Sequence, residues 1–158
     1  MATKAKKKTE TGESVIRIEG MHKWFGNFHA LKDIDLEVFQ GEKIVICGPS
    51  GSGKSTAARV ITGLLPQKSG SVIFDNFDLP KTLAERSKEQ KRRIQMIYQM
   101  ADTAMNPRQT VRDIIGRPLE FYLSMQGEEK VERTIDLLKM IELNADFLER
   151  LPAELSGG

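Results

Sequence analysis

The sequence predicts an α/β fold with a strand-rich part over residues 14–98 and a helical part over residues 108–154. Short apolar runs typical of strands recur up to residue 98. One of these runs leads through a glycine-rich turn into a segment with helical periodicity, and a strand–loop–helix unit is typical of α/β proteins. Beyond residue 108 the apolar residues recur every three or four positions, which predicts helices.

The strand-rich part contains four runs that we expect to be strands: VIRIE, LKDIDLEVF, KIVIC and SVIF. The segment KSTAARVITGLL predicts a helix lying on the sheet, from its apolar residues Ala57, Val60, Ile61, Leu64 and Leu65. Gly63 and Pro66 are expected to end this helix. Residues 81–93 are strongly charged and predict a solvated helix or linker.

The run IQMIYQ predicts a further strand, and Asn106-Pro107 predicts the turn that follows it. Two helices are then expected, in TVRDIIGRPLEFYLSM and EKVERTIDLLKMIEL. The second is supported by the spacing of Val131, Ile135 and Leu138, which places all three on one helical face.

Composition limits the class of protein. No run of about 18 apolar residues and no apolar N-terminal stretch is present, which predicts a cytoplasmic chain. The single cysteine, Cys47, lies in an apolar run and is expected to be buried, so no disulfide framework is predicted. His22 and His29 have no neighbours at metal-ligand spacing and are expected to be structural.

The net charge of +2 comes from residues 1–13, which carry four lysines and two glutamates. This leader contains no aromatic residues, so it resembles a disordered solubilising segment more than a nucleic-acid-binding arm. We therefore predict no nucleic-acid partner.

The segment GPSGSGKS, residues 48–55, matches the G-x-x-x-x-G-K-[ST] pattern of a phosphate-binding loop, between an apolar run and a helix. Its glycines let successive N–H groups point inward, and the helix N-terminus adds its positive dipole. Lys54 is predicted to reach the β- and γ-phosphates, Ser55 to bind Mg²⁺, and Thr56 to bind a phosphate nearer the sugar. The predicted phosphate cradle comprises Gly48, Pro49, Ser50, Gly51, Ser52, Gly53, Lys54, Ser55 and Thr56. This loop alone does not separate kinases, GTPases and transport ATPases.

Three further motifs make residues 14–158 resemble the nucleotide-binding subunit of an ATP-binding cassette (ABC) transporter: MHKWFG, MIYQ and the closing LSGG. The resemblance implies that Phe25 stacks on adenine and that Gln99 contacts Mg²⁺ or the attacking water. With Lys54, Gln99 would form the catalytic set. It also implies that Ser156, Gly157 and Gly158 bind the γ-phosphate held by the other subunit of a head-to-tail dimer.

The same resemblance implies a P-loop NTPase cassette with a mainly parallel sheet, an antiparallel β edge subdomain and an α-helical subdomain. The implied divisions are an ATP-binding core over 14–98, a glutamine loop over 99–107, and a helical subdomain over 108–158 that ends in the signature motif. The implied cofactors are ATP and Mg²⁺. The implied partners are integral membrane permease subunits, a second ATPase subunit and, indirectly, a solute-binding protein, with the chain peripheral on the inner face of the cell membrane.

The front half most resembles importers of polar amino acids, which is the predicted function. The segment from IQMIYQ onward resembles oligopeptide importers, so an oligopeptide or dipeptide importer is the first alternative. A soluble ABC ATPase acting on ribosomes or DNA is a second. A phosphate-loop kinase is a third, although it leaves Gln99 and LSGG unexplained.

In the family, the Asp, Glu and His that complete ATP hydrolysis follow the signature motif, and no segment of this chain resembles them. The fold is therefore predicted to be incomplete at its C-terminus. We expect this 158-residue chain to bind nucleotide only poorly or moderately, not to hydrolyse it, and to expose apolar strand edges that favour aggregation.

Overall fold

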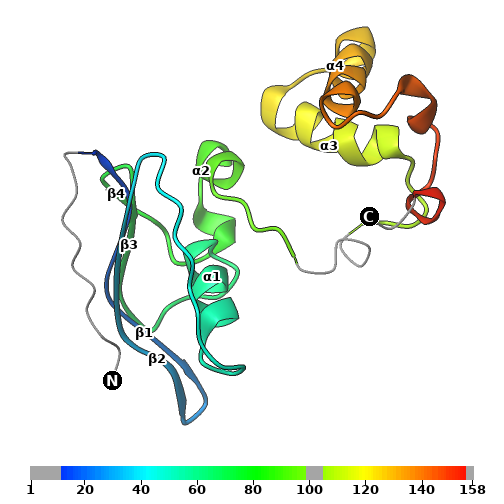
Figure 1. Cartoon of the computed structure of the whole chain (residues 1–158). Coiled ribbons are helices and arrows are strands. Elements are labelled where there is room, and N and C mark those ends of the chain that lie inside the picture. The colour runs from blue at the N-terminus through cyan, green and yellow to red at the C-terminus, as the bar shows by residue number, and fades with distance from the viewer. Residues whose placement is uncertain (1–11, 99–104, 156–158) are drawn as a thin grey trace. The chain divides into compact units, whose positions relative to one another are not determined.

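The structure is a computed structural model that describes residues 12–98 and 105–155. The chain divides into two compact units, Met1–Ile94 and Gln95–Gly158, and each is described by itself. In Figure 1 the first unit runs from blue to green, and the second contains the yellow and red helical segments.

The first unit is built on a four-stranded antiparallel sheet in the order β2-β1-β3-β4 (Figure 1). Its strands are β1 (Ser14–Phe25), β2 (Phe28–Phe39), β3 (Ser69–Phe74) and β4 (Phe77–Asp78). The long β1–β2 hairpin covers the first two expected strands, and β3 covers the expected SVIF strand. The strands alternate between buried and more exposed residues because successive side chains point to opposite faces.

Helix α1 (Lys54–Ile61) packs its apolar stripe onto one face of this sheet. Val60 is fully buried there, and Gly63 takes a φ of +79° after the helix ends, as expected from the sequence. The core of the unit consists of Ile18, Met21, Leu31, Val60, Val72, Phe74 and Leu79. The helix that carries Lys54 is thus fixed to the sheet by hydrophobic burial.

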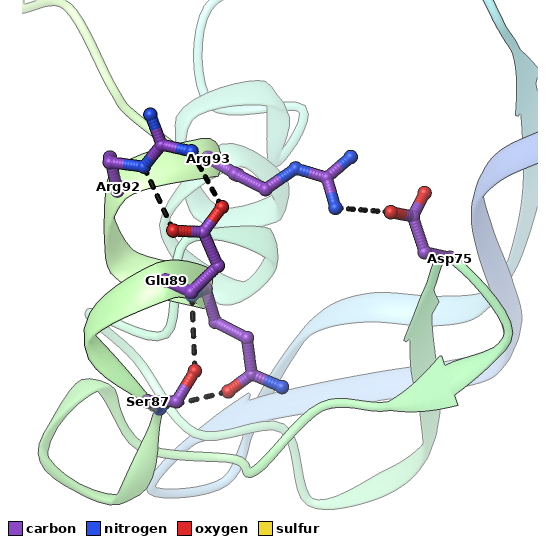
Figure 2. A network of polar contacts seen from close by, with 6 residues as sticks. Asp75, Ser87, Glu89, Arg92 and Arg93 are labelled. Atoms are coloured by element: carbon purple, nitrogen blue, oxygen red, sulfur yellow. Dashed lines mark hydrogen bonds and ion pairs between the residues drawn. The ribbon is translucent and has the colours of Figure 1, made fainter.

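A short 3-10 turn, η1 (Leu83–Glu85), and helix α2 (Lys88–Arg93) form the charged stretch at the end of the first unit. Figure 2 shows how α2 is held: Ser87 caps its N-terminus, and the Arg92 guanidinium binds both carboxylate oxygens of Glu89 at 2.7 and 2.9 Å. Arg93 pairs with Asp75 in the turn between β3 and β4. These contacts tie the end of α2 to the edge of the sheet.

One residue of this charged stretch contradicts the expectation that it is only solvated. Arg86 is buried, and its guanidinium donates to the carbonyl oxygens of Pro80 at 3.1 Å and Ile61 at 2.7 Å. Burial lowers the pKa of Arg86 from its ordinary value, and the two carbonyls accept hydrogen bonds from two of its N–H groups. Ile61 ends α1, so Arg86 caps the negative end of the helix dipole.

Two expected strands are not formed among the described residues. The run 43–47 (KIVIC) and residues 95–98 have no strand assignment, and Val45 and Ile97 are 83% and 93% exposed. Cys47, expected to be buried, is also exposed. A buried strand of a parallel sheet depends on neighbours on both sides, and no described strand pairs with either run. The α/β class is confirmed, but the sheet formed by residues 12–98 is antiparallel, and no parallel strand pair occurs among the described residues.

The second unit contains the two expected helices, α3 (Val111–Leu123) and α4 (Gly127–Met140). They are followed by the 3-10 turns η2 (Ala145–Phe147) and η3 (Pro152–Glu154). Thr110 begins α3 through a capping box, in which its hydroxyl accepts from the Asp113 N–H at 3.3 Å. The core of this unit consists of Val111, Leu138 and Leu148, surrounded by partly buried apolar residues.

Candidate functional site

The phosphate loop joins residue 48 to helix α1 through backbone conformations that favour glycine. Gly51 and Gly53 have φ angles of +79° and +97°, a region that other residues adopt only with strain. Gly53 also packs closely on β2. A Cβ at this position would lie 2.9 Å from Leu31 Cδ2 and 3.0 Å from the Ala30 carbonyl oxygen. The second glycine of the motif therefore lets the start of α1 lie against the sheet.

Lys54 folds back over the loop. Its Nζ donates to the carbonyl oxygens of Gly48 at 2.8 Å and Pro49 at 2.7 Å, and lies 3.4 Å from Ser52 Oγ. The ammonium group is thus held directly above the loop by acceptors that the loop itself supplies. An anion bound in the loop would therefore lie close to this positive charge.

The N-terminus of α1 is open to a negatively charged ligand. Gly53 offers no side-chain cap, and the first turn of the helix carries no acidic residue. The first intrahelical hydrogen bond runs from the Ala57 N–H to the Gly53 carbonyl at 2.8 Å. The N–H groups of Lys54, Ser55 and Thr56 come before it and have no acceptor within the helix. Donors of this kind fit phosphate oxygens. The exposed Ser55 hydroxyl in the same turn is a hard oxygen ligand that suits Mg²⁺. The residues present therefore fit a nucleotide with its metal.

The aromatic residues at the end of the β1–β2 hairpin lie on two different faces. The register moves from Lys23↔Leu31 to Trp24↔His29, which leaves Ala30 as an extra residue, a β-bulge. Trp24 stacks on His29, with ring centroids 3.6 Å apart and planes at 9°. Phe25, next to Trp24 in an extended strand, points to the opposite face.

Phe25 lies on the face that carries the core and the phosphate loop. Lys23, which shares that face, places its Nζ 5.3 Å from the centre of the Phe25 ring and donates to the Pro66 carbonyl after α1 at 2.7 Å. Phe25 is 46% exposed, so its ring is accessible to a ligand. The hairpin partner of Phe25 is Phe28, which is 64% exposed. Phe28 is not among the site residues predicted from the sequence, although the FGNF turn places two aromatic residues around a two-residue loop.

The structure brings part of the predicted site together. Strand β2 carries both Phe28, at the aromatic turn, and Ala30 and Leu31, which contact Gly53. Both the predicted base platform and the phosphate cradle thus border one short segment of β2. Gln99, Ser156, Gly157 and Gly158 lie outside the described residues.

The second unit contains a surface groove of about 380 Å³ along α3. Phe121 is 55% exposed in this groove, and the Arg117 side chain adds a positive charge to an otherwise largely apolar lining. Pro118, which also lines it, lies inside the helix and cannot donate the usual backbone hydrogen bond. The other lining residues are Met105, Asn106, Gln109, Ile114 and Tyr122.

Neither a membrane span nor a cluster of metal-ligating side chains occurs in the part of the chain that the structure describes. No helix within residues 12–98 and 105–155 is long and apolar enough to cross a bilayer. The same residues contain no group of three or more His, Cys, Asp or Glu side chains that could hold a metal ion.

Comparison with known proteins identifies the family. The family model described as "ABC transporter" matches residues 31–158. This chain belongs to the ABC transporter family. The match includes the whole phosphate loop, and the predicted P-loop NTPase class is confirmed by the solved structures that resemble the chain.

Among curated relatives, the nickel import ATP-binding protein NikE of Brucella suis biovar 1 (strain 1330) is 36% identical over 151 residues. The alignment covers 94% of this chain and 57% of that protein. NikE of Escherichia coli (strain K12) is 36% identical over 128 residues, covering 81% of this chain and 48% of the relative. The chain thus spans about half the length of the curated relatives it matches.

Two solved structures show the same fold. A nucleotide-free ATP-binding cassette from an ABC transporter has a TM-score of 0.69 and 30% identity, covering 91% of this chain and 60% of that one. The dimeric post-hydrolysis state of the ATP-binding cassette MJ0796, bound to ADP and Pi, has a TM-score of 0.70 and 31% identity. That alignment covers 90% of this chain and 63% of the other.

Proposed function

We propose that this chain is the nucleotide-binding part of an ABC importer ATPase, with ATP and Mg²⁺ held by residues 48–56. The observation that carries the proposal is the loop geometry: Lys54 Nζ lies over the loop, beside an uncapped helix N-terminus. The family match and the cassette structures support it. In the whole protein, ATP hydrolysis would supply the energy for transport.

The phosphate loop is tested by removing the Lys54 charge. Lys54→Ala should weaken ATP binding at least about tenfold, because a hydrogen bond to a charged group contributes about 1.5–3 kcal/mol. The matched control is Lys81→Ala, which removes an exposed lysine outside the loop. Isothermal titration of ATP with Mg²⁺ into folded protein measures both. Equal affinities for the two variants would overturn the loop assignment.

The remaining site residues belong to the same proposal. Phe25 would stack on adenine, since its accessible ring lies on the phosphate-loop face of the hairpin. Gln99 would contact the metal or the attacking water. Ser156, Gly157 and Gly158 would complete the site of a second subunit in a head-to-tail dimer; the similar MJ0796 cassette is described as dimeric, which supports dimer formation.

We assign the groove along α3 to the membrane permease. Exposed Phe121 and the apolar lining fit an apolar partner segment, and Arg117 fits an acidic residue within that segment. Phe121→Asp should release the chain from membranes of cells that contain its permease, because a carboxylate would be buried in the contact. Leu123→Asp is the control, since Leu123 is exposed on α3 but does not line the groove. Sedimentation with ribosomes instead of membranes would favour the soluble, non-transport alternative.

The transported solute is set by partner proteins, because a cassette ATPase does not contact it. The expected polar amino acid finds no support in the two relatives described above, whose names specify nickel import. Nickel is therefore the first solute to test, followed by oligopeptides. Uptake of radioactive ⁶³Ni by cells with and without the full-length protein decides between them, and unchanged nickel uptake would exclude nickel.

A further inference from the structure

Lys23 connects two parts of the candidate site. Its Nζ donates to the Pro66 carbonyl oxygen at 2.7 Å and lies over the Phe25 ring, 5.3 Å from the ring centre. The first contact is a hydrogen bond from a charged donor, and the second lies within the range of about 6 Å over which a cation is attracted to an aromatic face. Within residues 12–98 and 105–155, the described ion pairs do not include Lys23, so its charge is available to the ring.

The Pro66 carbonyl is a well-fixed acceptor, because the chain on either side of it is held. The Leu65 N–H donates to a carbonyl of α1 at 3.1 Å, and the Lys68 N–H donates to a carbonyl of β1 at 2.8 Å. The segment that follows α1 is therefore attached both to its own helix and to the strand that carries Lys23. A hydrogen bond to this segment fixes the position of the ammonium group.

The strand position of Lys23 adjoins the phosphate loop. Lys23 and Phe25 are two residues apart on β1, so their side chains point to the same face of the hairpin. The cross-strand partner of Lys23 is Leu31, whose Cδ2 would lie 2.9 Å from a Cβ at Gly53. One residue pair of the hairpin thus borders the start of α1 through Leu31 and the predicted base platform through Lys23.

The contact with Lys23 favours one orientation of the Phe25 ring. The ring is 46% exposed, and rotation about its Cβ–Cγ bond is only weakly restricted by the side chain itself. The ammonium group covers one face of the ring and leaves the opposite face for a nucleotide base. A group that is ordered before its ligand binds loses less conformational freedom on binding. The ring is therefore preorganised for stacking on its free face.

We propose that Lys23 is a positioning residue that holds the Phe25 ring in the orientation in which adenine stacks on it. This inference rests on the proposed function, in which Phe25 binds the base. It assigns to Lys23 an effect on the base and not on the phosphates, because the described contacts of the ammonium group are with Phe25 and Pro66.

The experiment compares ATP with inorganic tripolyphosphate, which offers the phosphate loop three phosphates but has no base. Titration calorimetry with Mg²⁺ measures the dissociation constants of both ligands for the 158-residue chain. Their ratio is the preference for ATP, and the different charges of the two ligands cancel when this ratio is compared between variants. In Lys23→Met, the preference should fall about two- to fivefold, the factor that corresponds to a cation–π contact at an exposed site.

Further variants separate positioning from folding and from general charge effects. Lys23→Arg keeps a cation that can stack on an aromatic ring and donate to a carbonyl, so it should retain the preference. Lys23→Gln is a second neutral side chain and should lose the preference as Lys23→Met does, so the test does not depend on one variant being folded. The control, Lys68→Met, removes a positive charge from an exposed side chain beside the same strand and should behave as the wild type. Urea unfolding followed by Trp24 fluorescence checks that each variant is folded.

A double-mutant cycle shows whether Lys23 acts through the Phe25 ring. Phe25→Leu alone should lower the preference for ATP, because it removes the π-face. Adding Lys23→Met to Phe25→Leu should lower the preference no further, since no ring remains to be positioned. A lysine that contacted the base itself would instead have the same effect with and without the ring.

The inference is overturned if Lys23→Met and Lys23→Gln keep the wild-type preference, if Lys68→Met lowers it as much as they do, or if the loss in Lys23→Met is the same with and without Phe25. Failure of the wild type to bind either ligand would instead refute the phosphate loop and, with it, both proposals. A preference that Phe25→Leu leaves unchanged would refute the Phe25 assignment together with this inference, while leaving the phosphate loop intact.

Discussion

Replacing Gly53 by alanine should destabilise the first unit more than the same change at Gly51. Both residues have positive φ, so each variant carries about 1–2 kcal/mol of backbone strain. Only at Gly53 would the new Cβ meet other atoms, Leu31 Cδ2 at 2.9 Å and the Ala30 carbonyl at 3.0 Å. At Gly51 nothing lies within 4 Å. Overpacking of this kind costs about 1–3 kcal/mol more.

The expected loss in the free energy of unfolding is therefore about 2–5 kcal/mol for Gly53→Ala and about 1–2 kcal/mol for Gly51→Ala. Alanine also restricts the unfolded chain, but by a similar amount at both positions, so this effect cancels in the comparison. Urea unfolding followed by Trp24 fluorescence reports on the first unit alone, because Trp24 is the only tryptophan and lies in β1. Equal losses would show that Gly53 does not pack against β2, and that its place in the motif reflects conformation only.

Three other predictions test separate parts of the structure. Arg86→Met should lower the free energy of unfolding by about 2–3 kcal/mol, because two carbonyls lose their buried donor, and Arg86→Lys should not restore both hydrogen bonds. Unchanged midpoints of urea unfolding would contradict this. Leu138→Ala should lower the free energy of unfolding of the second unit by about 2–5 kcal/mol, whereas the exposed Met140→Ala should lower it by less than about 0.5 kcal/mol. Urea unfolding followed by circular dichroism measures both, and equal midpoints would show that Leu138 is not a core residue. Phe25→Ala should weaken ATP binding in titration calorimetry whereas Phe25→Tyr should not, and a larger loss in Trp24→Ala would identify the other aromatic residue as the platform.

Local sequence patterns predicted the features that depend on a few neighbouring residues. The α/β class, the helix after the phosphate loop and the two later helices follow from apolar spacing, and the structure confirms them. The phosphate loop was placed at residues 48–55 because its glycines and lysine occupy fixed offsets in one short segment. This motif depends only on residues within the segment, so it can be recognised without knowledge of the rest of the fold.

Contacts between distant segments required the tertiary structure. Arg86 lies in a charged stretch, yet it is buried because the end of α1 and Pro80 supply carbonyl acceptors that only folding brings to it. The runs at 43–47 and 95–98 are apolar, as strands of a buried sheet would be, but pairing needs a neighbour and none is formed among the described residues.

The base platform shows the same division between sequence and structure. The sequence offered Trp24 and Phe25 side by side, and the family resemblance selected Phe25. Alternation along β1 places Trp24 and Phe25 on opposite faces, and the bulge at Ala30 on β2 makes His29 the cross-strand partner that stacks on Trp24. Whether a strand contains a bulge depends on its pairing with the neighbouring strand. This pairing cannot be predicted from the sequence of either strand alone.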